Sequence, residues 1–224
     1  MLKAIIFDAY GTLISTGTGS VDAARAILHK NRREDIEAKA FYARWKQLHR
    51  AHMDAPGFIT EEEIFRLDLR ALFAEYGIEG DADGDVGIML DTLGRRAAFP
   101  ETKAVLDALC GQTAVCIGST TDTAPLLQDM ERNGLCVHRV FTSESLRAYK
   151  PAPVFYEKIL SELRLQPEEA LFVGDSLMDD VLGPQSVGMR ACWVNRKHAD
   201  PGGARPDHIV ADLNGLLSIT DMLF

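Results

Sequence analysis

Two kinds of hydrophobic pattern divide this chain. Between about residues 15 and 98, apolar positions recur every three or four residues, which predicts helices that each bury one side. Before and after this segment, short apolar runs alternate with helical patterns, as is typical of a doubly wound parallel sheet. The pattern therefore predicts a Rossmann-like α/β core formed by residues 1–14 and 99–224, with an inserted all-helical domain at residues 15–98.

The inserted segment is expected to hold four helices. Ser20 is placed to cap the first helix, while Thr60 and Glu63 form a capping box for the third, which Gly77 ends. An acidic stretch at residues 80–85 is predicted to be a solvated loop before the fourth helix. The first helix is expected to begin at Val21, and the others to cover about residues 35–53, 61–76 and 86–95.

The core segment alternates strand and helix signals. The predicted strands cover residues 4–7, 114–118, 140–142, 170–174, 191–194 and 209–210. The predicted helices cover residues 101–110, 125–132, 154–163 and 181–187. Each strand is short and strongly apolar, so both of its faces are expected to be covered by helices.

Polar residues follow three of the predicted strands. They are Asp8, Ser119 with Thr120, and Asp175. Because the carboxyl ends of parallel strands lie at one edge of a sheet, these side chains are expected to converge there. Gly11 permits a sharp turn after the first strand, and Lys150 stands in a loop just before a proline. Each residue taken alone could be a turn cap or a surface charge, but together they favour a site with Asp8 as nucleophile.

Composition and charge narrow the possible partners. The hydrophobic share of 46% and charged share of 25% are those of a soluble globular protein. A net charge of -9 disfavours nucleic acid and anionic membranes, although a local basic pocket could still bind a small anionic substrate. No signal-peptide pattern or membrane-length apolar run is evident, so a cytoplasmic location is the default expectation. Of the four scattered cysteines, Cys116 and Cys192 are expected to be buried free thiols.

With these residues the chain resembles the haloacid dehalogenase superfamily. Four family motifs occur in order: Asp8-Ala9-Tyr10-Gly11-Thr12, Ser119, Lys150, and Gly174-Asp175-Ser176-Leu177-Met178-Asp179-Asp180. The resemblance implies a Rossmann-like core, a helical cap over the site, and an aspartate nucleophile that forms a covalent intermediate. It implies catalytic roles for Asp8, Tyr10, Thr12, Ser119, Thr120, Lys150, Asp175 and Asp180, and substrate contacts for Gly11, Arg44 and Tyr156.

The resemblance also implies a magnesium ion where the substrate is a phosphate. The implied ligands are Asp8, the backbone carbonyl of Tyr10 and Asp175, with Asp179 or Asp180 holding the ion's waters. Such a cation would offset the repulsion between the anionic nucleophile and an anionic substrate. The expected partner is therefore a small anionic molecule, and the expected oligomeric state is a monomer or homodimer.

One position departs from the phosphatases of this superfamily. They usually carry a second aspartate two residues after the nucleophile, as general acid and base, whereas this chain has Tyr10 there. A phenol is a poor base near neutral pH. Tyrosine at this position resembles the 2-haloacid dehalogenase branch, as do Tyr156 and the segment around Arg44, although Arg44 could also be a solvated helix residue. His49 and His52 are expected to be surface residues, without acidic partners at the spacing of metal ligands.

Asp175, in contrast, favours the metal-dependent phosphatases. Metal-independent dehalogenases carry neutral residues there, and a second carboxylate beside Asp8 without a cation would weaken the nucleophile. We therefore expect a Mg²⁺-dependent phosphatase of a small phosphorylated metabolite, acting through an aspartyl-phosphate on Asp8. The alternatives are an L-2-haloacid dehalogenase with an ester intermediate on Asp8, and a catalytically weak binding or regulatory member.

Overall fold

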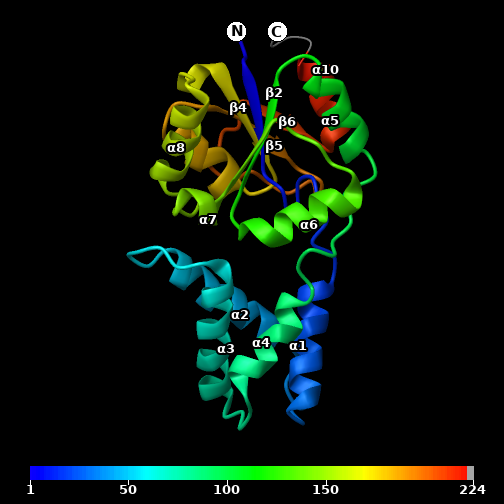
Figure 1. The fold of residues 1–224 in the computed structure, drawn as a ribbon, viewed down its shortest axis with the longest axis vertical. Helices are drawn as coiled ribbons and strands as arrows, with labels where there is room; N and C mark the ends of the chain where they lie inside the picture. The colour runs from blue at the N-terminus through cyan, green and yellow to red at the C-terminus, as the bar shows by residue number, and fades with distance from the viewer. Residues whose placement is uncertain (221–224) are drawn as a thin grey trace.

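A computed structural model describes residues 1–220 of the chain. A sheet covered by helices, here called the core, stands above a group of four helices, here called the cap (Figure 1). The N-terminus and the last described helix lie at the end of the core remote from the cap (Figure 1). The strands run toward the cap, so their carboxyl ends face it.

The core sheet has six strands, all parallel to their neighbours, in the order β3-β2-β1-β4-β5-β6. Their bounds are β1 (Ala4–Phe7), β2 (Ala114–Ser119), β3 (Arg139–Thr142), β4 (Ala170–Gly174), β5 (Arg190–Val194) and β6 (His208–Val210). The predicted α/β fold with a doubly wound parallel sheet is confirmed. Its first strand, β1, lies at the centre, between β2 and β4.

Helices cover both faces of this sheet. Ile5 and Phe7 pack toward the face covered by α5 (Thr102–Cys110), α6 (Thr123–Asn133) and α10 (Leu213–Thr220). Ala4 and Ile6 pack toward the opposite face, which α8 (Pro153–Leu163) covers. Since all four of these β1 residues are fully buried, the two-sided covering explains why the strand is an uninterrupted apolar run.

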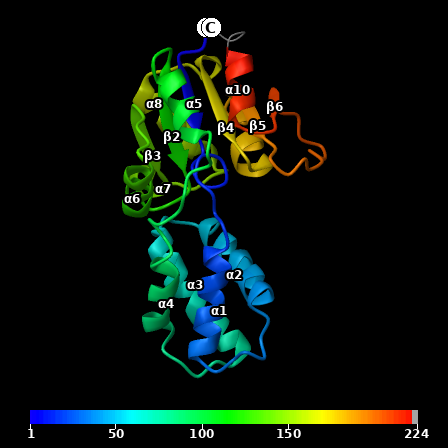
Figure 2. The same cartoon turned by 90° about the vertical axis from the view of Figure 1, so that its right-hand side faces the viewer.

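The cap consists of α1 (Gly19–Lys30), α2 (Ala38–Met53), α3 (Glu61–Tyr76) and α4 (Ala82–Leu90). Figure 2 shows these helices packed together below the sheet. They enclose an apolar cluster of their own, in which Phe41, Trp45 and Leu69 are buried. Two passages of chain join the cap to the core, and they meet where Ser15 N donates a 2.8 Å hydrogen bond to Ala97 O.

Several helix ends differ from the predictions. The first helix begins at Gly19, so the prediction of Ser20 as its N-cap is wrong, and Thr18 holds that position. The second begins at Ala38 instead of near residue 35, because the Glu37 carboxylate accepts hydrogen bonds from the following backbone amides. The capping box of Thr60 with Glu63 is confirmed, as is the left-handed Gly77 that ends α3.

The acidic stretch is partly helical instead of a loop. The Asp81 carboxylate accepts a hydrogen bond from Gly84 N, which starts α4 at Ala82, and the helix ends at Leu90. In the core, residues 181–187 do not form the predicted helix. A wide π-helical turn, η2 (Leu177–Leu182), and the short α9 (Gly183–Gln185) stand there. Three further helices were not predicted, namely α7 (Ser143–Leu146), the 3-10 turn η1 (Pro167–Glu169) and α10.

Two expectations from composition can be checked. Cys116 and Cys192 are buried and free, as predicted. No helix within residues 1–220 combines the length and the apolar character that crossing a membrane requires.

The separate apolar cluster of the cap predicts the effect of a cavity there. Leu69 is fully buried between the cap helices, whereas Leu67 on the same helix is 39% exposed. We expect Leu69→Ala to lower the free energy of unfolding by about 2–5 kcal/mol, because it removes buried methyl groups and leaves a cavity. Urea denaturation followed by circular dichroism measures the change. The matched control Leu67→Ala should change stability by less than about 0.5 kcal/mol, and equal effects of the two variants would contradict the packing described.

Candidate active site

Asp8 follows directly on β1 and is almost entirely buried. Its backbone N donates a 2.8 Å hydrogen bond to Val173 O, which fixes it against β4. The chain then turns at Gly11, whose φ of +102° is accessible to glycine and strained for other residues. A Cβ atom at Gly11 would lie 2.4 Å from Asp175 Oδ1. Glycine is therefore needed here both for the turn and for the approach of the second carboxylate.

Lys150 joins two of the carboxylates. Its Nζ lies 2.7 Å from Asp8 Oδ1 and 2.7 Å from Asp180 Oδ1. The side chains of Lys150 and Asp180 are only 2% and 1% exposed, so little solvent screens these ion pairs. Burial disfavours the charged ammonium, but the attraction of Asp180 and Asp8 is stronger and raises the pKa of Lys150, which stays protonated.

Asp175 supplies the third carboxylate. One oxygen from each of Asp8, Asp175 and Asp180 lies within 4.8 Å of the others, and the Thr12 hydroxyl donates a 3.3 Å hydrogen bond to Asp175 Oδ1. Burial raises the pKa of Asp8 and of Asp175, and raises the pKa of Asp180 to about 7 even though Lys150 opposes it. Each carboxyl group is thus harder to ionise beside the others than it would be in water.

These groups fit a divalent cation. With all three carboxyl groups ionised, the one ammonium would leave two negative charges for a cation to balance, and the oxygens are hard ligands of the kind that Mg²⁺ prefers. The residues that would hold the ion are Asp8 and Asp175 with the backbone carbonyl of Tyr10. Asp180 lies beside them, in reach of the same space.

Asp179 and Tyr156 have other partners. The Asp179 carboxylate accepts hydrogen bonds of 3.0 and 3.2 Å from Arg50 of the cap, so it links the two parts of the structure. Tyr156 is fully buried under the sheet, and its hydroxyl donates to the backbone carbonyl of Asp179. The structure thus does not bring Tyr156, predicted to contact substrate, to an accessible surface. Instead, the hydroxyl of Tyr156 supports the π-helical turn η2 through the backbone carbonyl of Asp179.

Tyr10 is held away from acid–base chemistry. Its hydroxyl donates a 2.9 Å hydrogen bond to Asp129 Oδ2, and the Arg96 guanidinium lies over its ring at 4.7 Å. Burial, followed by the charge of Asp129, raises the pKa of Tyr10 far above its usual value. The phenol therefore remains protonated, with its proton committed to Asp129.

Arg44 is not at the site either. Its Nε donates to both carboxylate oxygens of Glu75 at 2.9 Å, and this pair lies at the cap surface. This agrees with the alternative interpretation of Arg44 as a solvated helix residue. Arg50, six residues further along α2, reaches the core instead.

A cleft of about 320 Å³ lies between the cap and the core. Aromatic and apolar side chains line it from the cap, and charged groups surround them: Tyr42, Trp45, Met53 and Phe65, with Lys46, His49, Arg50, Glu61 and Arg96. Tyr10 and Thr120 form its floor on the core side. The Thr120 hydroxyl is buried and has no hydrogen-bond partner among the described residues, while Ser119 is buried at the end of β2. Tyr10 and Thr120 follow β1 and β2, so the cleft reaches the same edge of the sheet as the carboxylate cluster, although none of the three clustered acids lines it.

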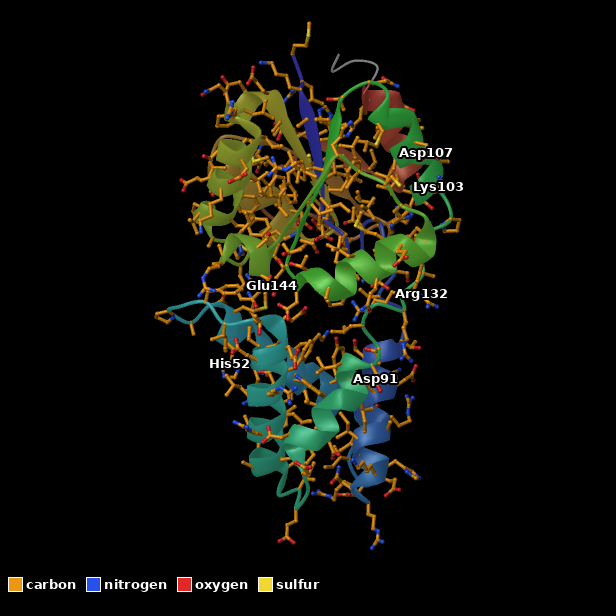
Figure 3. All side chains as sticks on the ribbon, in the orientation of Figure 1. His52, Asp91, Lys103, Asp107, Arg132 and Glu144 are labelled. Carbon is orange, nitrogen blue, oxygen red and sulfur yellow. The ribbon has the colours of Figure 1, made fainter. Side chains whose placement is uncertain are left out.

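The loop after β2 holds the cap in this position. The Asp122 carboxylate accepts hydrogen bonds from the backbone amides of Glu61 and Glu62, both at 2.9 Å, and so caps the N-terminus of α3 from the core. The Thr121 hydroxyl donates a 2.9 Å hydrogen bond to Glu61 Oε2. Glu144 lies on the side of the core that faces the cap (Figure 3) and accepts a hydrogen bond from Thr123 N in the same region.

The prediction of His49 and His52 as surface residues is wrong, because their side chains are only 16% and 33% exposed. Both histidines contact Asp68, a fully buried carboxylate on α3, with 2.7 Å between each Nδ1 and an Asp68 oxygen. His49 also lines the cleft. The sequence held only a weak signal for this network, namely a carboxylate on the otherwise apolar face of the third helix.

Comparisons with known proteins identify the class of hydrolase to which this fold and its acidic sheet edge belong. A model of haloacid dehalogenase-like hydrolases matches residues 2–188, and the chain belongs to this family. The chain is 27% identical to pyrimidine 5'-nucleotidase PynA of Streptococcus pneumoniae, over 98% of this chain and 95% of that protein. It is also 27% identical to haloacetate dehalogenase H-2 of Moraxella sp., over 97% of each chain.

Among solved structures, the chain is similar to the Bacillus subtilis hydrolase YfnB bound to magnesium. The TM-score is 0.83 at 21% identity, and the match covers 98% of this chain and 99% of that one. At this identity the likeness shows the fold. The chain is equally similar to a nucleotidase and to a dehalogenase, so these similarities do not distinguish the two reactions.

The position of the Tyr10 hydroxyl predicts a structural role. We expect Tyr10→Phe to lower the free energy of unfolding by about 1–3 kcal/mol, because the buried Asp129 carboxylate loses a donor. Hydrolytic activity should change less than about threefold, since removing a spectator group leaves the transition state intact. Thermal unfolding and steady-state kinetics measure the two effects. Tyr76→Phe is the matched control, since Tyr76 does not line the cleft and its hydroxyl has no hydrogen bond among the described residues. A loss of activity without a loss of stability would contradict the assignment.

Proposed function

We propose that the protein is a Mg²⁺-dependent phosphohydrolase that acts on a small phosphomonoester through an aspartyl-phosphate on Asp8. The observation that carries this proposal is the excess of negative charge at the carboxylate cluster. Asp175 adds a third acid beside Asp8 and Asp180, whereas Lys150 supplies only one cation. A divalent cation balances such a cluster, and an anionic nucleophile without one would repel a phosphate dianion.

The residues of the site suit the two steps of such a reaction. A carboxylate oxygen of Asp8 attacks phosphorus, and the bond from phosphorus to the ester oxygen breaks as that oxygen leaves with a proton. Water then attacks the phosphorus of the aspartyl-phosphate, which releases inorganic phosphate and restores the carboxylate. Lys150 orients Asp8 and offsets charge, and in this proposal Ser119 and Thr120 donate hydrogen bonds to the phosphoryl oxygens, for which the unpartnered Thr120 hydroxyl is available. A bound magnesium ion would polarise the phosphoryl group.

The cleft supports a small substrate with an apolar or aromatic body. Its volume of about 320 Å³ and its lining of Tyr42, Trp45 and Phe65 suit a metabolite-sized group. The basic side chains Lys46, Arg50 and Arg96 favour an anion in a chain whose overall charge is negative. The similarity to a pyrimidine nucleotidase is in keeping with this class of substrate.

One observation favours a second candidate, an L-2-haloacid dehalogenase. The Tyr10 proton is committed to Asp129, so the position that normally supplies the acid of a phosphatase cannot protonate a leaving group. A halide leaves without a proton, and Asp8 would then attack carbon to form an ester. The similarity to haloacetate dehalogenase H-2 is in keeping with this reading.

Metal removal tests the main proposal. We expect turnover of p-nitrophenyl phosphate that EDTA abolishes and added Mg²⁺ restores, because the carboxylate cluster needs a cation to accept a phosphate. Asp8→Asn should lower kcat on the order of 10³-fold or more, since it removes the nucleophile. Mg²⁺ should also raise the Tm of the wild type but not that of Asp175→Asn. Asp91→Asn, which changes an exposed acid of the cap, is the matched control. Turnover that persists in EDTA would overturn the proposal.

Halide release separates the two candidates. With L-2-chloropropionate in EDTA we expect no chloride release above that of Asp8→Asn, because the substrate carboxylate would approach a cluster with unbalanced negative charge. Ion chromatography measures the chloride. Release that persists in EDTA and disappears in Asp8→Asn would establish the dehalogenase in place of the phosphatase.

A further inference from the structure

A phosphatase of this kind has to supply a proton to the leaving alcohol. Only a few side chains in the cleft could donate that proton. The groups in the cleft that titrate or carry charge are Tyr10, Tyr42, Lys46, His49, Arg50, Glu61 and Arg96. Arginine does not release its proton, and the Tyr10 hydroxyl is committed to Asp129. The side chains of Lys46 and Tyr42 contact each other, with 5.5 Å between the ammonium and the ring centre, but make no hydrogen bond among the described residues that would fix a proton donor in place. This leaves His49 and Glu61, which face each other with 3.7 Å between His49 Nε2 and Glu61 Oε1.

Asp68 fixes the orientation of His49. The carboxylate is fully buried on α3 and accepts from Trp45 Nε1 at 3.2 Å, as well as from His49 and His52. In a charged imidazole both ring nitrogens carry a hydrogen, so the His49 Nδ1 that contacts Asp68 donates to it. The other ring nitrogen, Nε2, is then directed toward Glu61, and the ring packs at 4.7 Å on Phe65. The imidazole is thereby held in one orientation, as a proton donor must be.

The surroundings keep this imidazole charged. Burial lowers the pKa of His49, but hydrogen bonds to Asp68 and Glu61 outweigh it and raise the pKa to about 9. Lys46 and Arg50 from α2, and Arg96 from the segment that joins the cap to the core, also line the cleft. His49 is consequently protonated at neutral pH, which is the state that a general acid requires.

We propose that His49 is the general acid that protonates the leaving oxygen, with Asp68 and Glu61 as positioning residues. This inference rests on the proposed phosphohydrolase function. As the bond from phosphorus to the ester oxygen breaks, its electron pair stays on that oxygen, which takes the proton from His49 Nε2. The neutral imidazole then accepts a proton from the water that attacks the aspartyl-phosphate, and the cycle is complete. The cap thus supplies the group that Tyr10 cannot.

The basicity of the leaving group provides the test. p-Nitrophenolate leaves readily without a proton, whereas phenolate of nearly the same size needs one. We expect His49→Gln to lower kcat/KM for phenyl phosphate by about 10²-fold or more, the usual contribution of general acid catalysis. For p-nitrophenyl phosphate the loss should be at least tenfold smaller. Both assays use the Mg²⁺-loaded protein.

His52→Gln is the matched control. His52 contacts the same Asp68 at the same 2.7 Å, but it is not among the residues that line the cleft, and it lies at the outer margin of the cap (Figure 3). This variant should leave the ratio of the two kcat/KM values unchanged. If His49→Gln lowers kcat/KM equally for both substrates, the role of the network is structural and the proposal fails. It also fails if His52→Gln changes the ratio of the two kcat/KM values as much as His49→Gln does. Absence of p-nitrophenyl phosphate turnover by the wild type would instead overturn the proposed function.

A pH profile gives an independent readout if His49→Gln folds poorly. A general acid must be protonated, so kcat/KM for phenyl phosphate should fall as the pH rises through the pKa of His49, near 9. In Asp68→Asn the carboxylate that raises this pKa is gone, and the basic limb should move to lower pH by about one unit or more. A basic limb that stays in place would overturn the assignment.

Discussion

The site depends on one buried ammonium group. Lys150 lies between Asp8, at the end of β1, and Asp180, in the π-helical turn after β4, at 2.7 Å from each. Without it, two carboxylates would be buried without a counter-charge, which is among the costliest arrangements in a protein interior. With it, the loop before α8 and the turn after β4 are tied to the central strand. The same ion pairs align Asp8, so the contact that secures this edge of the sheet also orients the proposed nucleophile.

The neighbouring glycines follow from this constraint. A Cβ at Gly174 would lie 2.3 Å from Asp180 Oδ2, and one at Gly11 would meet Asp175 at 2.4 Å. Both carboxylates approach the backbone so closely that no side chain fits, and this crowding brings three acids within 4.8 Å. Tyr156 supports the arrangement from below through the carbonyl of Asp179. The acidic cluster is therefore a product of close packing.

The sequence predicted this edge well because its signals are local. Apolar runs ending in Asp8, Ser119 and Asp175 indicate buried parallel strands, and parallel strands bring their carboxyl ends together. The cap side was less predictable. Whether Arg44 or Arg50 faces the core depends on the rotation of α2 against the sheet, and the contacts of Asp68 join two helices that pack only in the folded chain. The wrong helix starts have a similar cause, since Glu37 and Asp81 compete as N-caps with nearby polar residues.

Charge is arranged in layers across the cleft, and this arrangement bears on the kind of substrate. The core presents carboxylates, whereas the cap and its connections present Lys46, Arg50, Arg96 and a protonated His49. A neutral molecule would gain nothing from the basic side and would leave those groups partly desolvated. A monoanionic haloacid would meet the basic side but has no need of a proton donor held by a fully buried carboxylate. The proposed phosphomonoester would use both layers, because its dianionic group calls for a cation at the carboxylates and its ester oxygen calls for a proton from the opposite wall.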